Sequence, residues 1–239
     1  MNLKNASVIA LILIIASTLL IICGSILYFT SMLKDNINLQ TLTSVFASIL
    51  PVPFGSLGVV LLLSAVISRL SKPDSGLGST LAVLAGVLIL LCALITIITC
   101  ITNAFPLYRY LPLGRFLYYM AANFFGIASN LTLGIFAFTI SGRSSGKVLA
   151  LLALISHVAI LLINLGNVAI SFGQSFAQRD FLVNLGSMGM ILGSFGIPIA
   201  IIFFLLMFLK QKPWPPMADV KGWSPEPLPT LNAQAPLPG

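Results

Sequence analysis

Six stretches of this sequence are each apolar for long enough to cross the hydrocarbon core of a membrane. They cover approximately residues 7–29, 44–70, 79–102, 116–141, 147–172 and 181–209. A core of roughly 30 Å requires about 20 residues of α-helix, and every backbone group inside it must find a partner within the protein. Runs of this length do not alternate as the strands of a barrel do. The sequence therefore predicts an all-α, polytopic integral membrane protein with six transmembrane helices.

The charged residues exclude several functions. Only 7% of the 239 residues are charged, against about 25% in a soluble domain. No Asp, Glu, Lys or Arg lies in the middle of a predicted span. An ionisable group at depth is the usual mark of a proton relay, an ion path or a voltage sensor, so a proton pump or carboxylate-based transporter is disfavoured. The three cysteines, Cys23, Cys92 and Cys100, lie inside apolar runs and are interpreted as small buried hydrophobes.

The net charge of +7 comes from cations placed singly between the spans, with no basic patch of the kind that binds nucleic acid. Cytoplasmic loops of membrane proteins carry an excess of Lys and Arg. Eight cations fall on one side of the predicted topology: Lys4, Arg69, Lys72, Arg143, Lys147, Lys210, Lys212 and Lys221. The other side has Lys34, Arg109, Arg115 and Arg179. Both termini are therefore predicted to be cytoplasmic.

Polar side chains recur at helical spacing on one face of the fifth span. They are His157, Asn164, Asn167, Ser171 and Gln174, and the fourth span adds Asn123 and Asn130. Asn, Gln and Ser form hydrogen bonds across membrane helices, so helix packing is the favoured interpretation. A lining for a small-solute path and a docking face for another subunit are the alternatives. His157 is interpreted as a packing residue, with a gating, pigment or ligand contact as its alternative.

The sixth span carries a seam of small residues at steps of three and four. The seam consists of Gly186, Gly189, Gly193, Gly196 and Ala200. Small residues at this spacing let two helix backbones approach closely. We expect the seam and the polar face of the preceding span to form the two halves of one packing interface, either inside the bundle or with a neighbour. Pro198 is expected to bend the helix just beyond the seam.

Phe-Gly pairs occur at Phe54, Phe125 and Phe195, separated by 71 and 70 residues. A cation follows each phenylalanine at a nearly constant distance, which suggests three tandem helical hairpins in one orientation. Residues 103–115 are rich in proline and tyrosine and are predicted to form an outer loop. Its tyrosines are interpreted as an aromatic belt at the membrane surface, with a ligand-capping loop as the alternative.

The composition changes sharply after Lys212, and eight of the fourteen prolines follow it. We divide the chain into a six-span bundle, residues 1–212, and a cytoplasmic tail, residues 213–239. Proline-rich segments dock at little entropic cost. The residues expected to dock are Pro213, Trp214, Pro216 and Trp223. A disordered tail with Trp214 at the membrane surface is the alternative.

Taken together, these features favour a non-enzymatic structural or accessory subunit of a larger membrane protein complex. No nucleophile, metal cluster or carboxylate pair is placed within the spans, so neither an enzyme nor a cofactor is predicted, although a lipid or pigment contact stays open. The expected partners are membrane lipids and other membrane subunits or a second copy, not nucleic acid. The alternative function is a transporter or channel for an uncharged small or lipidic molecule, lined by Asn123, Asn130, His157, Asn164 and Asn167.

Overall fold

The computed structural model describes residues 1–32, 51–72, 76–110, 112–142, 146–175 and 181–211, apart from some side chains near the helix ends. These residues form α1 (Leu3–Met32), α3 (Pro51–Ser71), α4 (Leu77–Tyr110), α5 (Leu113–Ser141), α6 (Lys147–Ser175) and α7 (Phe181–Lys210), with no strand among them. Each of these six helices contains a segment long and apolar enough to span a membrane. The prediction of an all-α, multi-pass membrane protein is confirmed.

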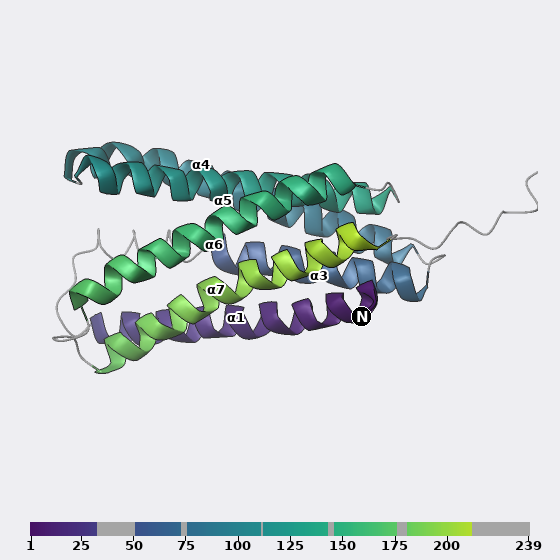
Figure 1. The fold of residues 1–239 in the computed structure, drawn as a ribbon, viewed down its shortest axis with the longest axis horizontal. Coiled ribbons are helices and arrows are strands. Elements are labelled where there is room, and N and C mark those ends of the chain that lie inside the picture. Colours follow the sequence, from purple (N-terminus) through teal and green to yellow (C-terminus); the bar gives the residue numbers. More distant parts are fainter. Residues whose placement is uncertain (33–50, 73–75, 111, 143–145, 176–180, 212–239) are drawn as a thin grey trace, which may run out of the picture.

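The six helices form a closed ring. Each packs against the next along the chain, and α7 returns to α1 in the most extensive contact of the bundle (Figure 1). The packing does not divide the chain into pairs, because α3 contacts α4 about as extensively as α4 contacts α5. The ring of described helices closes because α7 lies beside α1.

Gln211 joins the two ends of the described chain. Its Oε1 accepts a hydrogen bond of 2.7 Å from the backbone N–H of Leu3, and its Nε2 donates to the backbone oxygen of Met1 at 2.8 Å. The first N–H groups of a helix have no partner within the helix, so Gln211 caps α1 from the end of α7. We call the end of the bundle that holds Met1 and Gln211 the terminal end, and the opposite one the distal end.

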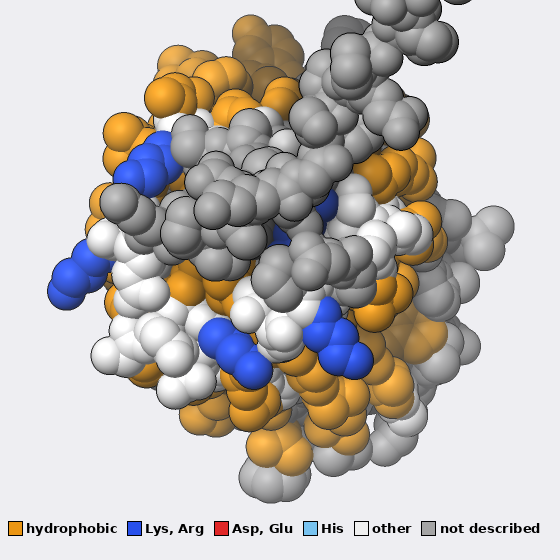
Figure 2. Space-filling model, turned by 90° about the vertical axis from the view of Figure 1, so that its right-hand side faces the viewer, with side chains coloured by type: hydrophobic (Ala, Val, Ile, Leu, Met, Phe, Trp, Pro, Cys, Tyr) orange, Lys and Arg blue, Asp and Glu red, His pale blue; other side chains and the backbone are white. Residues whose placement is uncertain are grey.

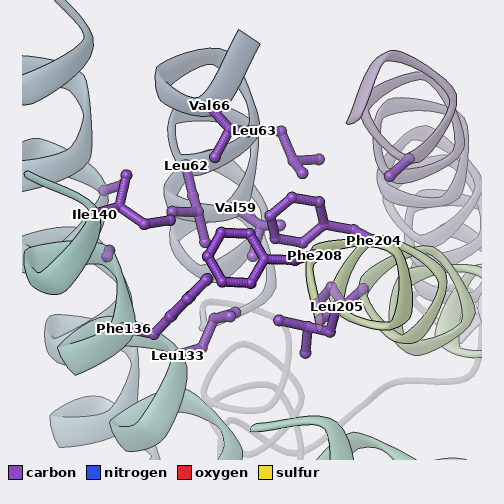
Figure 3. Close-up of a cluster of buried hydrophobic side chains, with 14 of the residues drawn as sticks. Val59, Leu62, Leu63, Val66, Leu133, Phe136, Ile140, Phe204, Leu205 and Phe208 are labelled. Atoms are coloured by element: carbon purple, nitrogen blue, oxygen red, sulfur yellow. The ribbon is translucent and has the colours of Figure 1, made fainter. Parts of the chain in front are cut away.

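The fully buried core occupies the half of the bundle nearest the terminal end. Phe136 of α5 meets Phe208 of α7 edge to face, with ring centroids 4.9 Å apart, and Phe204 packs beside Phe208 (Figure 3). Around these rings lie aliphatic side chains of α3 and of the same two helices, and α1, α4 and α6 add smaller contributions to the cluster: Val59, Leu62, Leu63, Val66, Leu133, Ile140 and Leu205 belong to the first group. Alternate helices of the ring, α3, α5 and α7, therefore meet through large side chains that fill its centre.

The turn between α5 and α6 depends on one glycine. Gly146 has φ 52°, a conformation that other L-residues rarely adopt. A Cβ at this position would also lie 3.1 Å from the ring of Phe136. The chain can therefore reverse next to the aromatic core without displacing it.

The predicted outer loop at residues 103–115 is wrong for most of its length. Helix α4 continues to Tyr110, and α5 begins at Leu113. Each further residue of a helix adds a backbone hydrogen bond. Contact with α5 supports the extension, because Tyr108 packs edge to face on Phe116 at 5.3 Å.

Candidate functional site

The glycine seam of α7 faces α1. A Cβ on Gly186 would lie 2.7 Å from the backbone oxygen of Gly24 and 2.7 Å from the backbone nitrogen of Tyr28. A Cβ on Gly24 would lie 2.6 Å from the backbone oxygen of Gly186. Real Cβ atoms do not approach backbone atoms this closely, so only glycine fits at either position. The two helix backbones are in direct contact here.

The same contact continues along the seam. A Cβ on Gly189 would lie 3.2 Å from the backbone oxygen of Leu20, and one on Gly193 would lie 2.5 Å from that of Ser17. Ser17 also lies against Gly196. Ala200 is fully buried and belongs to the core cluster. The seam thus has a partner inside the bundle.

The partner differs from the one expected from the sequence. The polar face of α6 was expected to form the other half of the seam interface, whereas the seam packs on α1. The α1 residues involved, Ser17 and Gly24, are seven positions apart and both small. That spacing places them on one helical face, and it is the signal that could have identified α1 as the partner.

Asn164, on the polar face of α6, forms a hydrogen bond with α7 one turn before Pro198. Its Nδ2 donates to the backbone oxygen of Ser194 at 3.2 Å. In a regular helix that oxygen accepts from the N–H four residues later. In α7 this later residue is Pro198, which has no N–H to donate. Asn164 therefore supplies the donor that the proline removes.

The other polar residues bond separate partners and do not converge on one point. Asn130 of α5 contacts Sγ of Cys92 on α4 at 3.6 Å, and Asn123 donates to the Tyr119 oxygen of its own helix at 2.9 Å. His157 is buried, with 4% of its surface exposed, and its Nδ1 lies 2.7 Å from the Ala153 oxygen. A side chain bonded to its own helix contributes little to recognition of a solute.

Several predicted site residues cannot be placed. The side chains of Asn167, Ser171 and Gln174 lie outside the described part of α6. The tail residues Pro213, Trp214, Pro216 and Trp223 also lie outside the described residues. Within the described ranges, no three His, Cys, Asp or Glu side chains are grouped closely enough to hold a metal ion.

Arg69 has a structural role that its sequence position did not reveal. It lies in the last turn of α3 with only 6% of its surface exposed, and its Nη2 donates to the Ser141 oxygen at 2.5 Å. The hydroxyl of Ser79 donates to the same oxygen at 3.2 Å. A cation is favourable at a helix C-terminus, where carbonyl oxygens lack donors. Arg69 thus ties the end of α3 to the end of α5.

Comparison with family models, with curated proteins and with solved structures finds no match for this chain. The six apolar helices define its class, a multi-pass integral membrane protein.

Asn164→Leu is expected to lower the free energy of unfolding by about 1–2 kcal/mol, because the Ser194 oxygen then lacks a donor in apolar surroundings. Pro198→Ala restores a backbone N–H to that oxygen, so Asn164→Leu should cost about 1 kcal/mol less in that background. Thermal unfolding of the four proteins in one detergent measures this double-mutant cycle. An equal cost of Asn164→Leu in both backgrounds would show that the side chain of Asn164 does not replace the backbone N–H that Pro198 lacks.

Proposed function

We propose that this protein is a non-enzymatic structural or accessory subunit of a larger membrane protein complex. The observation that carries the proposal is how the polar side chains of the spans are used. Asn123, Asn130, His157 and Asn164 each bond another atom of the same chain. Polar groups committed in this way stabilise a bundle, and they are poorly available to coordinate a passing solute.

The surface of α6 supports the proposal. Its apolar segment is the least covered of the six candidate spans. Large apolar side chains are exposed along one side of it: Val148, Leu151, Leu152, Ile155, Leu162 and Leu165. In a solitary bundle these side chains meet lipid. In the proposed complex a helix of the partner covers this side, and van der Waals packing replaces the lipid contact.

The tail, residues 213–239, is proposed to provide a second contact with the partner. It leaves the bundle next to Gln211, whose side chain holds the start of α1. The distribution of cations supports a cytoplasmic location for both termini. Three tandem hairpins, α1 with α3, α4 with α5 and α6 with α7, remain part of the proposal on the strength of the Phe-Gly spacing.

Purification from native membranes in a mild detergent, followed by native mass spectrometry, tests this function. The full chain is expected to co-purify with at least one other membrane subunit. The variant Trp214→Ala/Trp223→Ala should lose that partner while its thermal stability is unchanged, because both residues follow the last apolar span in the sequence. Asn232→Ala is the matched control in the tail and should retain the partner. A uniform monomer for the full chain would contradict the proposal.

One observation favours the second candidate, a path for an uncharged small or lipidic molecule. Gly126, Leu133 and Ile140 share one face of α5, and the last two are buried in the core. Around Gly126, however, no described residue lies within 4 Å of where a Cβ would stand. The inner face of α5 is therefore open towards the distal end.

Gly126→Leu distinguishes the two candidates. In proteoliposomes, the substitution should block uptake of an uncharged solute if the open face belongs to a path. If the protein is an accessory subunit, it should leave assembly with the partner unchanged. Uptake by wild-type proteoliposomes that equals uptake by protein-free vesicles of the same lipid would remove the transport candidate.

A further inference from the structure

The terminal end of the bundle carries exposed lysines on four separate parts of the ring. Lys4 lies in the first turn of α1, Lys72 directly follows α3, Lys147 begins α6 and Lys210 ends α7, and all four side chains are exposed. Figure 2 shows Lys and Arg side chains spread over the described part of this face. The positive charge is distributed and does not converge on one pocket.

Contacts between helices show that these helix ends lie at the same height along the axis of the bundle. Leu3 is bonded to Gln211, Arg69 is bonded to Ser141, and Phe136 packs on Phe208. These pairs join the start of α1 to the end of α7, the end of α3 to that of α5, and the last turns of α5 and α7. The four lysines therefore lie together at the boundary where the apolar segments end.

Each lysine is placed to reach a lipid headgroup. Lys4, Lys147 and Lys210 lie within the first or last turn of their apolar segments, and Lys72 is the residue after one. A long, flexible lysine side chain at this depth extends from the hydrocarbon edge to the phosphate level. The five acidic residues of the chain, Asp35, Asp74, Asp180, Asp219 and Glu226, lie outside the described ranges.

We propose that the terminal end binds the headgroups of anionic phospholipids, so that these lipids are enriched around the bundle in that leaflet. The spacing of the lysines over separate helices fits several individual headgroups better than one acidic segment of a protein. The proposal goes beyond the setting of topology, because it requires direct contact that discriminates anionic from zwitterionic lipid. It is independent of the proposed subunit function.

Lipid retention in nanodiscs tests the proposal. The full chain is reconstituted with phosphatidylcholine and phosphatidylglycerol at four to one, and the lipids that remain bound after release into detergent are counted by native mass spectrometry. A lysine near a charged headgroup is expected to favour phosphatidylglycerol about fivefold per contact. The quadruple variant Lys4→Gln/Lys72→Gln/Lys147→Gln/Lys210→Gln should lose this preference, and the matched quadruple Lys→Arg variant should keep it.

A substitution at the distal end provides the specificity control. Arg115 is an exposed cation in the first turn of α5 at that end, and Arg115→Gln should remove at most one contact, so its loss of phosphatidylglycerol retention should be far smaller than that of the quadruple Gln variant. Raising the salt concentration on the wild-type protein should weaken the preference, because exposed charges are screened, so the test stands even if the quadruple Gln variant fails to fold. Equal retention of the two lipids by the wild-type protein, or an equal loss in Arg115→Gln, would overturn the proposal.

Discussion

Gly24→Leu is expected to force α1 away from α7 and to lower the free energy of unfolding by more than about 3 kcal/mol, beyond the usual cost of overpacking a core. A Cβ on Gly24 would lie 2.6 Å from the Gly186 oxygen and 2.8 Å from the Met190 nitrogen. These are backbone atoms of the facing helix and cannot rotate aside as a side chain can. The most extensive helix contact in the ring would therefore open.

Labelling of buried thiols measures this opening. Cys92 and Cys100 are buried, whereas Cys23 is exposed, so the test uses a Cys23→Ala background and a thiol-reactive dye during heating. Gly24→Leu should label at a temperature lower by about 6 °C or more. Gly126→Leu is the matched control: no described residue stands within 4 Å of its Cβ position, and replacing a helical glycine should be neutral or stabilising. Equal destabilisation by both substitutions would contradict the role of the seam.

Phe208→Ala is expected to cost about 3–5 kcal/mol of unfolding free energy, the usual range for removing a fully buried aromatic ring. Phe208 is fully buried and contacts the rings of both Phe136 and Phe204. Its loss would leave a cavity where α3, α5 and α7 meet. It would also remove the edge-to-face contact with Phe136, which stabilises the fold beyond the burial of apolar surface. The terminal half of the bundle should lose its cooperative unfolding.

The control for this prediction is Phe124→Ala on α5. Phe124 has 65% of its surface exposed, so its removal should change stability by no more than about 0.5 kcal/mol. Thermal unfolding followed by the same thiol dye compares the two variants in one detergent. If Phe124→Ala were as destabilising as Phe208→Ala, the stability of the bundle would come from its outer surface and not from the centre of the ring.

The approximate positions of the six described helices that could span a membrane were predictable from the sequence. The length and hydropathy of a stretch decide whether it can cross a membrane, and both are local properties that add up along the chain. The error at residues 103–110 shows the limit of this reasoning. The helix there is extended by packing of Tyr108 on Phe116, a residue of the next helix, and hydropathy carries no information about such a contact.

The glycine seam shows more clearly which features follow from the sequence and which follow from the packing of the fold. Spacing alone identified Gly186, Gly189, Gly193 and Gly196 as a surface for close approach, because their positions on a helix follow from its period. Which helix approaches depends on how α7 is rotated and on its return to α1 to close the ring. Neither is a property of α7 itself.

Asn164 and Arg69 define what only the tertiary structure decided. The sequence showed that one is polar inside a span and that the other is a cation at the end of one. It did not show that Asn164 replaces the donor missing at Pro198, or that Arg69 caps α5 at Ser141. By itself the sequence determined that six segments are long and apolar enough to cross a membrane, since transfer into lipid is summed residue by residue. The pairing of helices was decided by the fold, because hydrogen bonds and backbone contacts require two distant segments to meet at atomic distance.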